Sequence, residues 1–209
     1  MQRSWRTDKD KLTFISCECD LSSSGIDDSR QQTQDEEIKS MIGDVNLFIV
    51  TNEGESGGVS LVGELELMIG DKSNTRRGLG RATLLVFIAY VLKHEEDILE
   101  EYFSAPREVA RVDRFDYYRV KIGETNTRSI GLFESVGFKK TEGFPNFFGE
   151  YELRISNLTA RDVDRMMEER GIEGYAEVPH ELADGEKVSP VPETLEHQVN
   201  GETEKLSIL

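Results

Sequence analysis

The sequence GELELMIGDKSNTRRGLGRATLLVFIAYVLK occupies residues 63–93 and decides the fold. Its first part continues an apolar run that ends at Ile69, which predicts a strand. A polar, basic stretch then leads to Gly78-Leu79-Gly80, and from Arg81 to Lys93 apolar residues dominate almost all round, as expected of a helix packed deep against a sheet. The sequence therefore predicts a strand that passes through a glycine-rich turn into a buried helix.

Such a turn gathers unpaired backbone N–H groups around one point at the start of the helix. Glycines allow a pyrophosphate to approach the backbone closely, the helix dipole adds roughly 0.3–1 kcal/mol, and flanking arginines offset the remaining charge. We therefore predict an anion-binding loop over Arg76-Arg77-Gly78-Leu79-Gly80-Arg81. A tight turn with no ligand would have a similar sequence.

Two other phosphate-binding patterns do not fit. Thr83 occupies the place of the third glycine in a dinucleotide fingerprint, and no strand-helix-strand unit precedes it. The Gly-Lys-Ser/Thr of a Walker loop occurs nowhere in the sequence.

The remaining sequence predicts a mixed α/β fold with a hairpin before the central helix. Turn residues between Met41 to Val50 and Leu61 to Ile69 indicate that these two apolar stretches form the hairpin. The predicted order is strand, hairpin, helix, strand, helix, strand, strand, over residues 11–17, 41–50, 61–69, 81–93, 117–122, 129–136, 138–141 and 147–155. We expect one domain over residues 1–155 and an acidic tail over residues 156–209, with a short helix followed by mostly disordered chain.

Composition excludes several classes of protein. A formal net charge of −16 argues against nucleic-acid binding, which needs a basic surface, and mildly favours a cationic substrate or partner. Acidity that only keeps the protein in solution is the simpler interpretation. Cys17 and Cys19 indicate reduced thiols and lack the further ligands of a metal site. Because the sequence shows neither a signal peptide nor a membrane-spanning run, we expect a cytoplasmic protein without a membrane or metal partner. Its oligomeric state is not readable.

A second motif lies over residues 126–138, NTRSIGLFESVGF. It resembles the second motif of GNAT-superfamily acetyltransferases, Asn-x-x-Ser/Ala-x-x-Leu-Tyr/Phe followed by Gly-Phe, and the glycine-rich loop resembles their Arg/Gln-x-x-Gly-x-Gly/Ala motif. Four short sequences, at residues 1–5, 42–48, 63–66 and 121–123, are similar to those of the N-acetyltransferase 9-like branch. The resemblance covers about residues 1–155.

This resemblance implies the GNAT acyl-CoA N-acyltransferase fold and acetyl-CoA as co-substrate. The acceptor would be a primary amine, at a protein N-terminus or a lysine. The residues expected to contact the cofactor are Leu67, Met68, Ile69, Arg76, Arg77, Gly78, Leu79, Gly80, Arg81, Asn126, Ser129 and Phe133. A plain helix cap would explain Asn126 nearly as well, and Phe133 is most simply a core residue.

Acetyl transfer to an amine requires a base rather than a metal or a covalent intermediate. Glu64 and Glu66, on one face of the strand before the loop, are the candidates, and the resemblance favours Glu64. Burial among apolar neighbours would make such a carboxylate a better proton acceptor, although both could be ordinary solvent-facing positions. Phe133 replaces a tyrosine that protonates the thiolate in many GNAT enzymes, so water or another group must do so here.

Three further departures from the family pattern appear. The branch begins several dozen residues earlier, with a strand and helices that wall the acceptor site, which we expect this chain to lack. Thr75 stands where the loop prefers arginine or glutamine, and residues 93–115 are longer than usual. The missing amino-terminal elements and Phe133 favour, as the alternative function, a catalytically impaired GNAT-like protein that acts as an interaction module. A bare structural α/β domain is the third possibility.

Overall fold

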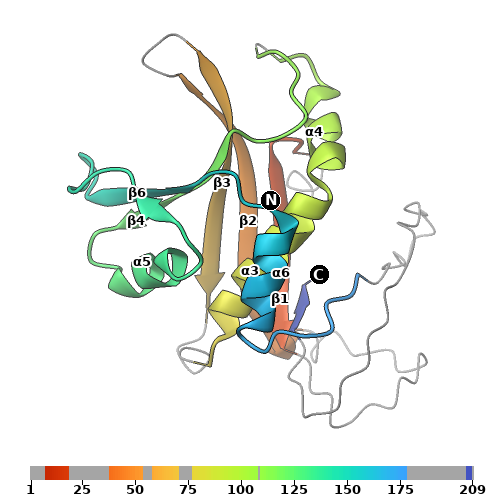
Figure 1. Ribbon diagram of the computed structural model, residues 1–209, viewed down its shortest axis with the longest axis vertical. Coiled ribbons are helices and arrows are strands. Elements are labelled where there is room, and N and C mark those ends of the chain that lie inside the picture. Colours follow the sequence, from red (N-terminus) through yellow and green to blue (C-terminus); the bar gives the residue numbers. More distant parts are fainter. Residues whose placement is uncertain are drawn as a thin grey trace.

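The computed structural model describes residues 8–18, 38–53, 58–70, 77–107, 109–177 and 206–208. It confirms the predicted mixed α/β fold, in which seven strands form one sheet in the order β5-β6-β4-β3-β2-β1-β7 (Figure 1). The elements are β1 (Lys11–Glu18), β2 (Met41–Glu53), β3 (Val59–Ile69), α3 (Leu79–Lys93), α4 (Glu95–Phe103), β4 (Tyr117–Gly123), α5 (Thr127–Glu134), β5 (Lys139–Lys140), β6 (Glu150–Ile155), α6 (Ala160–Glu168) and β7 (Leu206–Ile208).

The predicted hairpin is β2 and β3, which pair in antiparallel register from Gly43↔Ile69 to Glu53↔Val59. Successive side chains of a strand point to opposite faces, so β3 has two different faces. Leu61 and Leu65 belong to the hydrophobic core, whereas the glutamates between the apolar residues of β3 lie on the opposite face. The hairpin therefore gives the sheet one apolar and one polar face.

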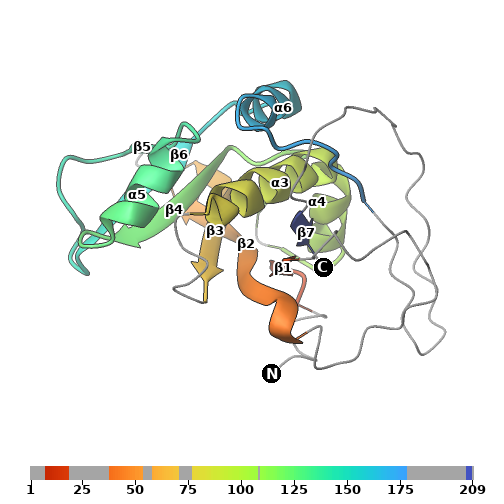
Figure 2. The same ribbon diagram turned by 90° about the horizontal axis from the view of Figure 1, so that it is seen from below.

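The central helix α3 is apolar nearly all round because it is covered on two sides. Leu84 and Phe87 are fully buried in the core beneath the sheet, and Val163 and Met167 of α6 join the same core. Figure 2 shows α3 and α6 on one side of the sheet. None of the helices in the described ranges is long and apolar enough to cross a bilayer.

The end of α3 differs from expectation. His94 stands at the polar end of the apolar run, in His94-Glu95-Glu96-Asp97, which predicts that it is exposed to solvent; His94 is only 7% exposed, so that prediction is wrong. Tyr90 packs on the imidazole with ring centroids 4.5 Å apart, and Glu177 Oε2 lies 2.9 Å from His94 Nε2. The segment after α6 thus returns to cover the end of α3. His180, His197 and Cys19 lie outside the described residues, and Cys17 is buried.

The strand predicted to begin at Phe147 begins at Glu150. The Asn146 side-chain oxygen accepts the N–H groups of Phe148 (2.9 Å) and Glu150 (3.0 Å), and Gly149 adopts a φ of 75°, so the chain turns here instead of extending. The turn leaves Phe147 97% exposed and Phe148 81% exposed.

The contacts of Glu177 generate a stability prediction. Partial burial alone would raise its pKa, but hydrogen bonds from Tyr175, His94 and Lys93 lower the pKa below its ordinary value of 4.5. A carboxyl group with a lowered folded-state pKa stabilises the fold above its unfolded pKa, and this contribution is lost as the pH falls through the folded pKa.

We therefore expect Glu177→Gln to destabilise the protein near neutral pH by about 1–2 kcal/mol, because charge-assisted hydrogen bonds are lost. The difference should shrink as the pH falls from the ordinary pKa of 4.5 toward the lower folded-state pKa of Glu177. Thermal unfolding by calorimetry at several pH values measures it, with exposed Glu173→Gln as the control. An equal destabilisation at neutral and acid pH would contradict the assignment.

Candidate functional site

Two parallel strands part in the middle of the sheet. Pairing between β3 and β4 runs only from Val62↔Tyr117 to Glu64↔Arg119, although both strands continue beyond that last pair. Figure 1 shows the two ribbons diverging from there. Within the described part of the chain, no other strand pairs with the second half of β3 on this side. We call the space between the diverging strands the gap.

The direction of the backbone groups along β3 follows from two hydrogen bonds at its ends. Asp116 N–H donates to the Leu61 carbonyl at 2.9 Å, so the backbone groups of Leu61 face β4. Gly70 N–H donates to the Ile42 carbonyl at 2.8 Å, so the backbone of Gly70 faces β2. Because these directions alternate along a strand, the odd-numbered residues of β3 face β4 and the even-numbered ones face β2.

Leu67 and Ile69 consequently turn their N–H and C=O groups into the gap. Met68, between them, turns its backbone groups toward β2, and its carbonyl oxygen lies next to Gly43. Of the three residues expected to offer backbone groups to a cofactor, two have the direction that this role requires.

The start of α3 lies at the open end of the gap. Gly78 adopts a φ of 86°, a left-handed conformation that favours glycine, and no side-chain hydrogen bond caps the helix in the described residues. A Cβ added to Gly80 would lie 3.6 Å from Ile69 Cγ1 and from Leu132 Cδ2. The first N–H groups of the helix, those of Leu79 and Gly80, precede its internal hydrogen-bond ladder. The helix N-terminus, the end of β3 and α5 therefore meet at one place.

The arginines beside this loop have protein partners. Arg77 Nη1 lies 2.8 Å from Glu18 Oε2, in an ion pair with β1. Arg81 Nε donates to Ser135 Oγ at 3.1 Å, which ties α3 to the end of α5. Arg76 lies outside the described residues.

The second motif forms α5, as predicted. Asn126 caps the helix, since its side-chain oxygen accepts the Ser129 N–H at 3.2 Å. Phe133 is 2% exposed and packs edge-to-face on Phe138 with ring centroids 5.2 Å apart. Asn126 thus lies at an exposed helix start, and Phe133 lies in the core.

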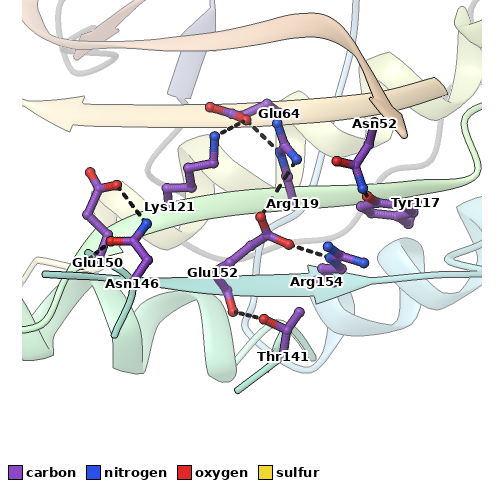
Figure 3. A network of polar contacts seen from close by, with 10 residues as sticks. All are labelled: Asn52, Glu64, Tyr117, Arg119, Lys121, Thr141, Asn146, Glu150, Glu152 and Arg154. Carbon is purple, nitrogen blue, oxygen red and sulfur yellow. Dashed lines mark hydrogen bonds and ion pairs between the residues drawn. The ribbon is translucent and has the colours of Figure 1, made fainter. Parts of the chain in front are cut away.

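The two candidate bases have different surroundings. Glu66 is exposed, whereas the side chain of Glu64 is 18% exposed and its Oε2 lies 2.6 Å from Arg119 Nε and 3.2 Å from Lys121 Nζ (Figure 3). Glu64 is therefore surrounded by cations, not by the apolar side chains that we expected. Arg119 and Lys121 were not among the site residues predicted from the sequence, although their spacing in β4 indicates that they share one face.

Neither tyrosine of β4 is arranged to protonate a leaving group. Tyr118 donates its hydroxyl to Glu95 Oε1 at 2.9 Å, and burial together with the Glu95 carboxylate raises the pKa of Tyr118 well above its usual range. The Tyr117 hydroxyl accepts a hydrogen bond from Asn52 Nδ2 at 2.9 Å. Both hydroxyl groups are thus engaged by neighbouring side chains.

A mixed sheet whose two parallel strands part beside a glycine-rich helix start defines the GNAT class of acyl-CoA N-acyltransferase folds. The solved structure of Arabidopsis thaliana NAA60 in complex with acetyl-CoA is similar, with 16% identity, a TM-score of 0.43, and 71% and 77% coverage of this chain and that chain. No protein-family model matches this chain.

Similar sequences identify the family within the GNAT class to which this chain belongs. A Dictyostelium discoideum protein named N-acetyltransferase 9-like protein is 36% identical over 156 residues, which are 75% of this chain and 63% of that protein. The Schizosaccharomyces pombe protein of the same name is 31% identical over 174 residues, with 74% of each chain covered. A Mus musculus protein named Alpha/beta-tubulin-N-acetyltransferase 9 is 30% identical over 75% of this chain and 52% of its own length. This chain belongs to the N-acetyltransferase 9-like family.

Gly80 provides a test of the helix start. An alanine Cβ would make only ordinary van der Waals contacts there, so we expect Gly80→Ala to leave the free energy of unfolding unchanged or raise it by up to about 1 kcal/mol. If a pyrophosphate approaches this backbone, the same methyl group should weaken acetyl-CoA binding about tenfold.

Isothermal titration calorimetry would measure this affinity. Gly131→Ala is the matched control, because it also replaces a helical glycine but meets no atom within 4 Å. An unchanged Kd in Gly80→Ala would count against a cofactor at this helix start.

Proposed function

We propose that this chain transfers an acetyl group from acetyl-CoA to a primary amine of a protein, with Glu64 as the general base. The observation that carries the proposal is the parting of β3 and β4 at Glu64, beside a helix N-terminus that no side chain of the described residues caps. Those features supply hydrogen-bond donors and a carboxylate at neighbouring points, as direct acetyl transfer requires. The names of the relatives support the same activity.

The cofactor is proposed to lie along the gap. The N–H groups at the start of α3 would hold its pyrophosphate, with Arg76, Arg77 and Arg81 contributing positive charge. The backbone groups of Leu67 and Ile69 would bind the pantetheine arm and polarise the thioester carbonyl. Asn126 and Ser129 would approach the cofactor from α5, and Phe133 would support that helix from the core.

The proposed reaction is a direct attack in which every proton has a defined donor and acceptor. An ammonium group loses a proton to Glu64 through water, and the neutral amine forms a C–N bond at the thioester carbon. The C–S bond then breaks, the nitrogen of the tetrahedral intermediate gives up its second proton through water, and that proton neutralises the departing thiolate. The protein supplies position, a base and amide donors, so this route needs neither a metal nor a covalent enzyme intermediate.

The acceptor is proposed to be a protein N-terminus, with tubulin as the first candidate because the mouse relative is named for it. Exposed aromatic side chains support a protein acceptor. Phe144, Phe147 and Phe148 are 70%, 97% and 81% exposed on the turn before β6, and that turn is joined to the end of β4 by a 2.8 Å hydrogen bond from Glu124 N–H to the Gly149 carbonyl. An apolar surface of this kind, joined to the end of a strand that borders the gap, suits contact with a polypeptide.

Activity measurements can distinguish the roles of Glu64 and Glu66. We expect Glu64→Gln to lower kcat about 100-fold, since a general base contributes at least this much, and Glu66→Gln to stay within about twofold of the wild type. The assay follows acetyl transfer from radiolabelled acetyl-CoA to purified tubulin and to peptides with free N-termini.

Thermal unfolding of both variants controls for folding. Wild-type rates in both would reject Glu64 as the base. A wild-type protein that binds acetyl-CoA without any turnover would favour the interaction module instead.

A further inference from the structure

Two cations converge on one oxygen of the proposed base. Arg119 Nε and Lys121 Nζ both contact Glu64 Oε2, at 2.6 Å and 3.2 Å. The shortest contact that each of these cations makes with Glu64 is to Oε2, and neither of the two contacts ends on Oε1. Figure 3 shows both contacts on one oxygen, with the other oxygen pointing along β3. The carboxylate is thus held by one oxygen while the other is available.

Arg119 is itself held in place from the other side. Its Nη1 lies 3.6 Å from Glu152 Oε2, and Glu152 also pairs with Arg154. The guanidinium of Arg154 in turn lies 4.4 Å above the ring of Tyr117. The network crosses β3, β4 and β6 on the face opposite α3, so the guanidinium that holds Glu64 has little freedom to move (Figure 3).

The Glu64–Arg119 ion pair lies at the end of the β3–β4 ladder. Glu64 and Arg119 are the last directly opposed residues of the β3–β4 ladder. Lys121 lies two residues further along β4, on the same strand face and beyond the point where the strands part. Lys121 therefore reaches back to the carboxylate from the side of the gap.

We infer that Lys121 is a positioning residue, which together with Arg119 holds Glu64 Oε2 so that Oε1 receives the proton of the acceptor amine. This inference rests on the proposed function of Glu64 as base. Arg119 alone would allow the carboxylate to rotate about a single contact. A second cation on the same oxygen fixes the orientation, and correct orientation of a catalytic group is a major source of rate.

Lys121 is the better member of the pair to test. Its side chain is 36% exposed, and its removal leaves the Arg119–Glu64 pair intact. Removing the nearly buried Arg119 would instead leave both Glu64 and Glu152 without their shared cation, which is expected to destabilise the protein.

The experiment compares Lys121→Met, Lys121→Arg and Glu64→Gln with the wild type in the full chain, by steady-state kinetics, acetyl-CoA titration and thermal unfolding. Lys140→Met is the matched control, because Lys140 belongs to β5 and its ammonium group lies over the Tyr151 ring, 3.8 Å from the ring centroid. We expect Lys121→Met to lower kcat about tenfold with unchanged Kd for acetyl-CoA and unchanged Tm, and Lys121→Arg to restore most of kcat.

Other results would reject either the positioning role of Lys121 or the proposed function itself. A kcat for Lys121→Met equal to that of Lys140→Met, in a protein where Glu64→Gln is impaired, rejects the positioning role and leaves the proposed function intact. A loss of kcat that follows a loss of Tm or of cofactor affinity rejects it as well, since the role would then be structural. Wild-type turnover in Glu64→Gln, or none in the wild type, overturns the proposed function and this inference together.

Discussion

The parting of β3 and β4 is the constraint on which the rest of the structure depends. Buried backbone N–H and C=O groups require partners, and the ladder that would supply them ends at Glu64 and Arg119. Beyond that pair, Leu67 and Ile69 direct their backbone groups toward a space that α3 and α5 border. A ligand with amide and phosphate groups complements such a space, and this complementarity links the fold to acetyl-CoA.

The sheet separates two chemical environments at the same point. On the face toward α3, apolar side chains pack the central helix firmly enough to fix where its N-terminus lies. On the opposite face, charged residues of β3, β4 and β6 hold Glu64 in a network of ion pairs. In our account the first face fixes the cofactor and the second fixes the base, so the reacting groups meet where the strands separate.

Local sequence patterns were sufficient to predict several elements of the fold and part of the candidate site. The hairpin, the helix after Gly78-Leu79-Gly80 and the Asn126 cap could be predicted because turn residues, apolar runs and caps act over a few neighbouring positions. The length of the β3–β4 ladder could not, since its register joins residues more than fifty positions apart. The same holds for the cations around Glu64 and for the burial of His94 by Glu177. These depend on which distant segments fold side by side, and a single sequence gives only the periodicity of each.

Hydrogen exchange at amide resolution, with and without saturating acetyl-CoA, is the most direct test that the cofactor binds in the gap between β3 and β4. We predict that acetyl-CoA strongly protects the amides of Leu67, Ile69, Leu79 and Gly80 from exchange. The protection of the Met68 amide should change little, because the backbone of Met68 faces β2. Unchanged protection at these four amides, in a protein that binds acetyl-CoA, would contradict it.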